Sequence, residues 1–86
     1  MKEKSFGKII AECRNKASLT QKQVAEKIGI HSYYVSIIEN GNIIPNKKNI
    51  LKFISLFDLD EDKIFKIVAN NKVSVYEEKL AKKYNK

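Results

Sequence analysis

The fold of this chain is decided by residues 20–41, which read TQKQVAEKIGIHSYYVSIIENG. Thr20 is a preferred N-cap residue, because its hydroxyl can accept a hydrogen bond from an N–H of the first helical turn. An apolar stripe at helical spacing follows and is formed by Val24, Ala25 and Ile28. Gly29 comes next, where a helix commonly ends in a left-handed residue that glycine adopts without strain. The pattern predicts a helix over Gln21–Ile28 and a tight turn after it.

A second helix is predicted to begin at His31 or Ser32 and to end before Gly41. Its buried face is formed by Val35, Ile38 and, in part, Tyr34. Its other face is formed by Ser32, Tyr33, Ser36 and Ile37. Two helices joined by a short turn that contains glycine form the helix-turn-helix unit, whose second helix enters the major groove of DNA. We therefore expect the second face to meet DNA.

Motifs along most of the chain share the spacing of one protein family. These motifs are Phe6-Gly7, Cys13-Arg14, Leu19-Thr20-Gln21, Gly29, Val35-Ser36, Ile38-Glu39-Asn40-Gly41 and Pro45. In this order they resemble the Cro/C1-type repressors, also called the XRE family. The resemblance implies an all-α, five-helix lambda-repressor-like DNA-binding domain over residues 1–70. It also implies a homodimeric transcriptional regulator that binds double-stranded DNA.

Three further helices are predicted in this domain. One runs over about residues 6–17. Another covers Lys47–Phe57, and its inward face is formed by Ile50, Leu51, Ile54 and Phe57. The last follows the N-cap Asp60 and runs to about Ala69. Its apolar face is formed by Ile64, Phe65 and Val68, and Ile67 is predicted to lie off that face.

Residues 71–86 form a C-terminal extension beyond the family resemblance. Ser74 and Glu77 have the spacing of a capping box, which predicts a sixth helix over Val75–Tyr84. Its apolar stripe is formed by Tyr76, Leu80 and Tyr84. Three roles are open for this helix: packing on its own domain, packing on a dimer partner, or lying on an acidic surface. The dimer role is slightly favoured.

The composition favours an anionic partner. The 86 residues include 17 Lys and Arg and 10 Asp and Glu, which gives a formal net charge of +7. A basic balance indicates nucleic acid first and a membrane surface second. The single cysteine, Cys13, cannot form an internal disulfide, so we expect a cytoplasmic protein. Cys13 is expected to be a small buried residue of the first helix.

Enzymatic, cofactor and membrane-spanning functions are not indicated. The chain contains no glycine-rich phosphate loop and no Cys–His pair at a motif spacing. His31 is the only histidine, so no metal site is expected, and its expected roles are a helix cap or a phosphate contact. No apolar run approaches the roughly 18 residues of a membrane-spanning helix.

The family resemblance assigns roles to several residues. In the family, an arginine at the position of Arg14 pairs with the glutamate at the position of Glu39. A bidentate pair here would tie the first helix to the third, whereas two separately solvated charges are the alternative. By the same resemblance, Gln21 contacts the DNA backbone, and the loop that begins at Asn40 presents N–H groups to phosphate.

The outer face of the recognition helix departs from the family's usual pattern, which has Ser or Thr at the position of His31 and then basic or amide residues. Arginine–guanine and glutamine–adenine pairs are therefore not available from this face. Tyr33 and Ile37 can contact thymine methyl groups, and packing under the following loop is the alternative for Ile37. We expect an operator rich in A·T pairs that is read largely through shape. The residues expected to contact DNA are Gln21, Ser32, Tyr33, Tyr34, Ser36, Ile37, Asn40 and Lys47.

In the family, the fifth helix and its approach commonly form the dimer interface. The matching candidates here are Leu59, Ile64, Ile67 and Val68. A dimer would place two recognition helices about 34 Å apart on a pseudo-palindromic operator. The alternative function is a protein–protein interaction module with an apolar surface formed by Ile37, Ile43 and Ile44. The sequence leaves open the direction of regulation, any inducer, and whether the protein is a prophage repressor, a restriction–modification controller or an antitoxin.

Overall fold

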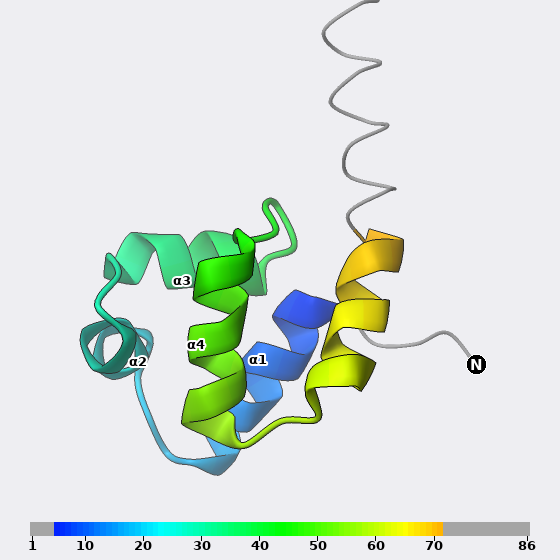
Figure 1. Ribbon diagram of the computed structural model, residues 1–86. Coiled ribbons are helices and arrows are strands. Elements are labelled where there is room, and N and C mark those ends of the chain that lie inside the picture. The colour runs from blue at the N-terminus through cyan, green and yellow to red at the C-terminus, as the bar shows by residue number, and fades with distance from the viewer. Residues whose placement is uncertain (1–4, 72–86) are drawn as a thin grey trace, which may run out of the picture.

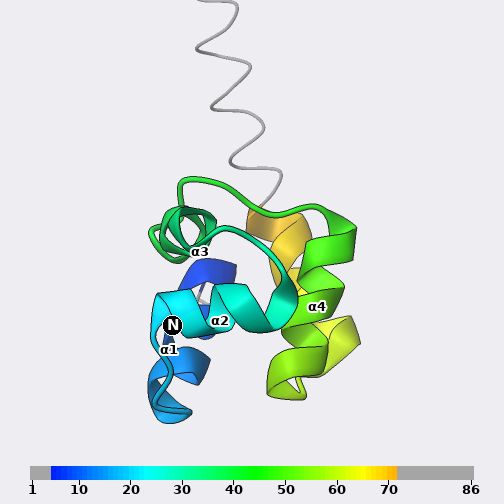
Figure 2. The same cartoon turned by 90° about the vertical axis from the view of Figure 1, so that its left-hand side faces the viewer.

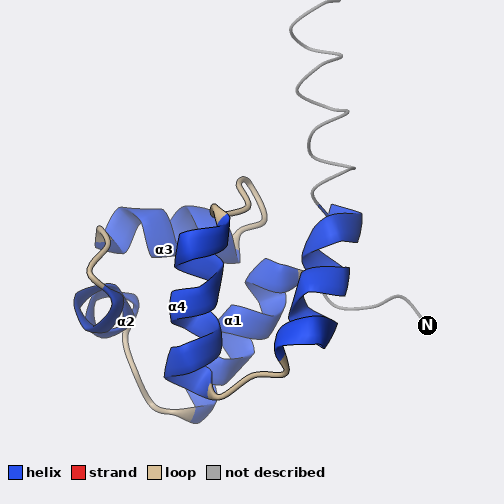
Figure 3. Cartoon of the chain, in the orientation of Figure 1, coloured by secondary structure: helices blue, strands red, loops and turns tan. Residues whose placement is uncertain are grey.

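Five helices account for most of residues 5–71, which are the part of the chain that the computed structural model describes (Figure 1). They are α1 (Phe6–Lys16), α2 (Gln21–Ile28), α3 (Ser32–Glu39), α4 (Lys47–Phe57) and a fifth helix over residues 61–71. Loops connect these helices, and this part of the chain contains no strand (Figure 3). The predicted all-α class and the five helices are confirmed. The sixth helix expected over Val75–Tyr84 lies outside the described residues.

The described helices are arranged with α2 and α3 on one side of the domain. α2 and α3 lie together on that side, and the fifth helix lies on the opposite side, with α1 and α4 between them (Figures 1 and 2). The outward surfaces of α2 and α3 are therefore not covered by the fifth helix.

Each described helix begins at a side chain that accepts a backbone N–H. At α2, Thr20 Oγ1 accepts from the N–H of Gln23 at 3.0 Å, and Gln23 Oε1 accepts from the N–H of Thr20 at 2.8 Å. The other caps are Ser5 for α1, His31 for α3, Asn46 for α4 and Asp60 for the fifth helix. Such a cap stabilises a helix by about 1 kcal/mol. The helix starts are thus fixed by local chemistry, as predicted.

Two helices end at a left-handed residue. Gly29 ends α2 with φ 72°, as predicted. Asp58 ends α4 with φ 53°, a conformation that is unfavourable by roughly 1–2 kcal/mol for a residue with a Cβ atom. Ile30 follows Gly29 and packs against the core, so the turn between α2 and α3 is held by an apolar contact as well as by its backbone.

A hydrogen bond joins the two ends of the described part of the chain. The N–H of Phe6 donates to Asn71 Oδ1 at 2.9 Å. Phe6 is the first residue of α1, and a first-turn N–H has no acceptor within its own helix. The end of the fifth helix therefore completes the cap of α1.

One apolar core lies between the helices. Its most completely buried side chains are Phe6, Ile10, Val24, Val35, Ile38, Ile50 and Phe53. The rings of Phe6 and Phe53 meet edge to face, with their centroids 5.9 Å apart and their planes at 83°. Such an arrangement places the positive edge of one ring against the negative face of the other. The pair joins α1 directly to α4.

The predicted inward face of α4 was wrong at Leu51. This side chain is 37% exposed, whereas Phe53, which the sequence pattern did not place in the core, is 0% exposed. Ile50, Phe53 and Ile54 share one face because they stand at positions i, i+3 and i+4. Leu51 is turned about 100° away from Ile50, and so it faces solvent.

The inward face of the fifth helix also differs from the prediction. Ile67 was expected off this face, but it is only 3% exposed. Phe65 was expected on the face, and it is half-buried and packs against the core. The spacing i, i+3 and i+4 again explains the result, since Ile64, Ile67 and Val68 form one stripe.

Gly7 sets the distance between α1 and α3. A Cβ atom at this position would collide with the carbonyl oxygen of Ile38 and would lie 3.1 Å from that of Glu39. Both oxygens belong to the backbone at the end of α3, so they cannot rotate out of the way. The absence of a side chain at Gly7 is what allows the two helices to approach so closely.

The substitution Gly7→Ala is expected to lower the free energy of unfolding by about 1–3 kcal/mol, because the added methyl group must displace packed backbone. Helix propensity alone acts in the opposite direction, since alanine favours a helix over glycine by about 1 kcal/mol. The measurement is urea unfolding followed by circular dichroism. Lys8→Ala, at the exposed neighbouring position of α1, is the control. A higher urea midpoint for Gly7→Ala would contradict the close approach of α1 and α3.

Candidate nucleic-acid interface

The recognition helix α3 is started by a histidine. His31 Nδ1 accepts a hydrogen bond from the N–H of Tyr33 at 3.1 Å, so His31 is the N-cap. Because Nδ1 acts as an acceptor, it carries no proton in this arrangement. Of the two roles expected for His31, the capping role is confirmed.

The two faces of α3 have the composition that was predicted. Val35 and Ile38 are buried at 0% and 1% exposure, and Tyr34 is half-buried against the core. Tyr33 is 68% exposed, which makes it the most prominent apolar side chain of the outer face. Ser32, Ser36 and Ile37 are partly exposed on this helix. The outer face therefore offers two hydroxyl groups and an aromatic ring to a ligand.

An ion pair fixes the end of α3 to α1. Arg14 Nε donates to Glu39 Oε2 at 2.7 Å, and Arg14 Nη2 donates to Glu39 Oε1 at 3.0 Å. The side chains are only 16% and 6% exposed, respectively. The hydrogen bonds to the carboxylate raise the pKa of Arg14 above its ordinary value, more than burial lowers it. The pair is thus the two-pronged, charge-assisted kind that holds a fixed geometry.

The same ion pair also holds the start of α2. Arg14 Nη1 donates to the carbonyl oxygen of Leu19 at 2.9 Å, just before the cap of α2. Gln21 Nε2 donates to Glu39 Oε1 at 3.1 Å. The sequence pattern did not predict this last bond. It means that Gln21 uses one amide N–H on Glu39 and keeps its other polar atoms for a ligand.

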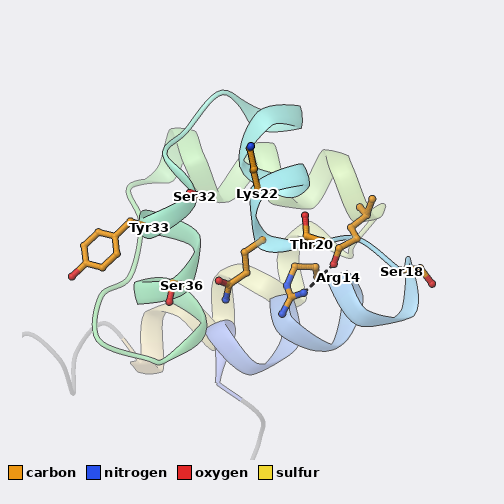
Figure 4. Close-up of a pocket in the computed structure, with 9 residues that line it drawn as sticks. Arg14, Ser18, Thr20, Lys22, Ser32, Tyr33 and Ser36 are labelled. Carbon is orange, nitrogen blue, oxygen red and sulfur yellow. Dashed lines mark hydrogen bonds between the residues drawn. The ribbon is translucent and has the colours of Figure 1, made fainter.

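The ion pair lies beside an open hollow between the start of α2 and the outer face of α3. The hollow has a volume of about 750 Å³. It is lined by Arg14, Ser18, Leu19, Thr20, Gln21, Lys22, Ser32, Tyr33 and Ser36. In Figure 4, the hydroxyl groups of Ser32, Ser36 and Thr20 lie around it, and Tyr33 extends from α3 at its edge. The hollow is thus open to solvent, lined by polar and apolar atoms together, and bordered by α3.

Lys22 brings a positive charge to the lining of this hollow. Lys22 lies in the first turn of α2, where the unpaired N–H groups already carry partial positive charge. A lysine at this end of a helix is unfavourable for the helix itself, whereas it reinforces an anion site. The charge of Arg14 is offset by Glu39, so Lys22 is the lining cation whose charge is not offset by an ion pair in the described structure.

The hollow brings together only part of the expected DNA-contacting set. Gln21, Ser32, Tyr33 and Ser36 line it, but the lining does not include Tyr34, Ile37, Asn40 or Lys47. Asn40 is the C-cap of α3. Lys47 instead lines a groove between α4 and the fifth helix, with Glu61 and Phe65. The sequence pattern missed Lys22, although its position beside Gln21 at a helix start was a usable signal.

The two apolar surfaces proposed from the sequence are largely buried within the protomer. Ile43 and Ile44 are partly buried and pack against the core, which removes most of the surface required by the protein-interaction alternative. Among the dimer candidates, Ile64, Ile67 and Val68 are 3–4% exposed, and Leu59 is half-buried. Each of these side chains exposes little surface by itself, although Leu59, Ile64 and Ile67 line a groove beside α1.

Other kinds of site are not found among residues 5–71. No group of three or more His, Cys, Asp or Glu in this range could hold a metal ion. No helix in it has the length and apolar character needed to cross a membrane. Cys13 is half-buried rather than fully buried as expected, and this burial raises the pKa of its thiol.

Comparison with known families agrees with this geometry. The chain matches the family model HTH_3, described as helix-turn-helix, over residues 10–64, a range that includes α2, the turn and α3. The fold and the match define a helix-turn-helix protein. Within that class, the chain belongs to the HTH_3 family, the XRE group that the sequence motifs indicated.

Three curated relatives have similar sequences. The ImmF control region 10 kDa protein of Bacillus phage phi105 is 33% identical over 57 residues, which cover 66% of this chain and 63% of the relative. The uncharacterized HTH-type transcriptional regulator YqaE of Bacillus subtilis is 30% identical over 68 residues, or 79% and 59% of the two chains. The HTH-type transcriptional regulator ImmR of the same species is 36% identical over 58 residues, or 67% and 46%. The alignments thus span 46–63% of the length of these relatives. No solved structure matches the chain significantly.

The substitution Glu39→Gln is expected to lower the free energy of unfolding by about 1–3 kcal/mol, between the values for exposed and for fully buried ion pairs. The reason is that Arg14 would lose its charged acceptor while remaining mostly buried. The measurement is urea unfolding, with Glu26→Gln at an exposed position of α2 as the control. A double-mutant cycle with Arg14→Met isolates the coupling between the two side chains. Strictly additive effects of Arg14→Met and Glu39→Gln would contradict a coupled pair.

Proposed function

We propose that this chain is a sequence-specific DNA-binding transcriptional regulator that inserts α3 into the major groove. The observation that carries the proposal is the open hollow in which the start of α2 and the outer face of α3 meet. A helix that is apolar on its inner face and rich in hydroxyl groups outside suits this groove, which is about 12 Å wide. The relatives named as HTH-type transcriptional regulators support the same function.

Two groups of residues divide the work of binding. Lys22 and the N–H groups at the start of α2 bind a phosphate and fix the position of the domain on the duplex. Ser32, Tyr33 and Ser36 meet the base edges. Since none of these three forms the two-pronged contacts of arginine or glutamine, discrimination rests on hydroxyl contacts, on thymine methyl groups against the Tyr33 ring, and on DNA shape. This supports an operator rich in A·T pairs.

The regulator acts as a homodimer on a pseudo-palindromic operator. Two recognition helices would then enter successive major grooves about 34 Å apart. Occupation of an operator excludes other proteins from the same stretch of DNA, so repression is the direction of regulation that we propose. The pairing of two weak half-site contacts also compensates for the absence of arginine–guanine pairs.

Selection from a random duplex library at two salt concentrations tests this function. A two-fold symmetric, A·T-rich motif is expected, with affinity that falls by orders of magnitude as salt rises, because phosphate contacts release bound counterions. Retention of DNA without an enriched motif would contradict base recognition by α3. Failure to retain any duplex at low salt would contradict the DNA-binding function itself.

Two substitutions separate base contacts from phosphate contacts. Tyr33→Ala is expected to weaken binding to the selected operator about 10-fold or more while leaving non-specific binding unchanged. Lys22→Gln is expected to weaken both and to reduce the slope of log affinity against log salt by about 1. Lys27→Gln, at the other end of α2 and outside the hollow, is the matched control. An unchanged salt slope for Lys22→Gln would remove Lys22 from the interface.

A further inference from the structure

A dimer needs an apolar surface, and the described part of the chain exposes little of one. The large hydrophobic side chains exposed among residues 5–71 are Tyr33 and Leu51. Tyr33 belongs to the face proposed for DNA, and Leu51 stands alone on α4. Stable protein interfaces usually bury about 1,200 Å² or more in total. The homodimer of the proposed function would therefore gain contact area from residues outside the described part.

A groove between α1 and the fifth helix can receive such residues. Its volume is about 590 Å³, and its lining includes Ile9, Glu12, Asp58, Leu59, Asp60 and Ile64. Isoleucine and leucine side chains give it an apolar character, and three carboxylates stand around them. The fifth helix, which forms one of its walls, lies on the opposite side of the domain from α2 and α3 (Figures 1 and 2), and none of the groove's lining residues lines the hollow between α2 and α3. An occupant of this groove would leave the DNA-facing hollow open.

The charge of this groove is opposite to that of the chain. Glu12, Asp58 and Asp60 line it together with a single lysine, Lys63, although the whole chain has a net charge of +7. A second groove, between α4 and the fifth helix, has one basic and one acidic residue in its lining. Charge therefore directs a basic, amphipathic occupant to the groove beside α1.

Residues 72–86 have the complementary chemistry. They include five lysines and two glutamates. In the helix predicted over residues 75–84, the apolar positions Tyr76, Leu80 and Tyr84 recur every fourth residue, with Lys79 and Lys83 along one border of this stripe. Such a helix would be about 15 Å long at 1.5 Å per residue.

We propose that residues 75–84 of a second copy of this chain occupy the groove between α1 and the fifth helix. The exchange is reciprocal, so that one two-fold axis relates two identical contacts. Tyr76, Leu80 and Tyr84 pack on the apolar floor, and the bordering lysines face the carboxylates. This inference rests on the homodimer of the proposed function and names the surface that forms it.

Occupation of the groove by a second copy accounts for the proposed dimer, whereas occupation by the same protomer does not. If residues 75–84 covered the groove of their own protomer, the described surface would still lack an apolar contact for a dimer. Reciprocal exchange fills two grooves with two amphipathic segments, and it supplies the two-fold symmetry that a pseudo-palindromic operator requires. The groove and residues 75–84 thus together form the dimer contact. The buried residues of the fifth helix can remain in the core.

A charge-swap experiment on the full chain tests this interface. One variant carries Lys79→Glu and Lys83→Glu, and the other carries Glu12→Lys and Asp58→Lys. The wild-type chain is expected to sediment as a dimer. Each variant alone is expected to dissociate about 10-fold or more readily, because like charges then face each other in both contacts. An equimolar mixture is expected to restore the dimer, since both contacts of the mixed pair carry opposite charges.

The mixture is also the control for folding, because an unfolded variant could not restore a dimer. Circular dichroism of each variant alone checks the same point. A monomeric wild-type chain would overturn the proposal, and so would variants that remain dimeric alone or a mixture that stays monomeric. Restoration of the dimer when all four substitutions are placed in one chain would further support the contact.

Binding of duplex DNA by the same proteins separates this inference from the proposed function. If the charge-swapped mixture behaves as expected but no duplex is retained at low salt, the regulator function fails and the interface stands. If an operator is bound but the substitutions leave the dimer unchanged, the interface fails and the function stands. The wild-type chain and both variants are therefore assayed for sedimentation and for DNA binding in the same buffer.

Discussion

The position of the recognition helix depends on the contact between Arg14 and Glu39. One guanidinium group binds the end of α3 through Glu39 and the approach to α2 through the carbonyl oxygen of Leu19. The same carboxylate accepts a hydrogen bond from Gln21 at the start of α2. The end of α3, the approach to α2 and the start of α2 are therefore tied to one pair of side chains. Because the pair is mostly buried, water and salt weaken it less than they would weaken a surface contact.

The close approach of the α1 backbone also holds α3 in place. Gly7 lets α1 approach the last turn of α3, and the rings of Phe6 and Phe53 connect α1 to α4. Such rigidity matters for the DNA interface that we propose, which lacks arginine–guanine contacts. Single hydroxyl groups and an aromatic ring discriminate between bases only when their positions are fixed, since each contact contributes little free energy by itself.

Helix boundaries could be predicted from the sequence because they depend on local chemistry. The buried face of a helix was predicted less well where several apolar positions could face the core. Caps such as Thr20 and a left-handed Gly29 act within one turn, so helix boundaries could be derived without a structure. α4 contains more apolar residues than one face can hold, and only the neighbouring helices decide that Phe53 is buried and Leu51 is not. The position of Lys22 in the first turn of α2 could be derived from the sequence, whereas the hollow that it lines depends on how α3 lies against the start of α2.

The bond from Phe6 to Asn71 has a consequence for the order in which the domain is completed during synthesis. It joins residues that are 65 positions apart, whereas α2 and α3 are neighbours in sequence. Local contacts form faster than distant ones, and the ribosome releases the N-terminal part first. The helix-turn-helix unit can therefore pack on α1 while the first turn of α1 is still hydrated. The cap of α1 is completed only when the fifth helix has been synthesised. The last contact of the domain to form is therefore one that stabilises its first helix.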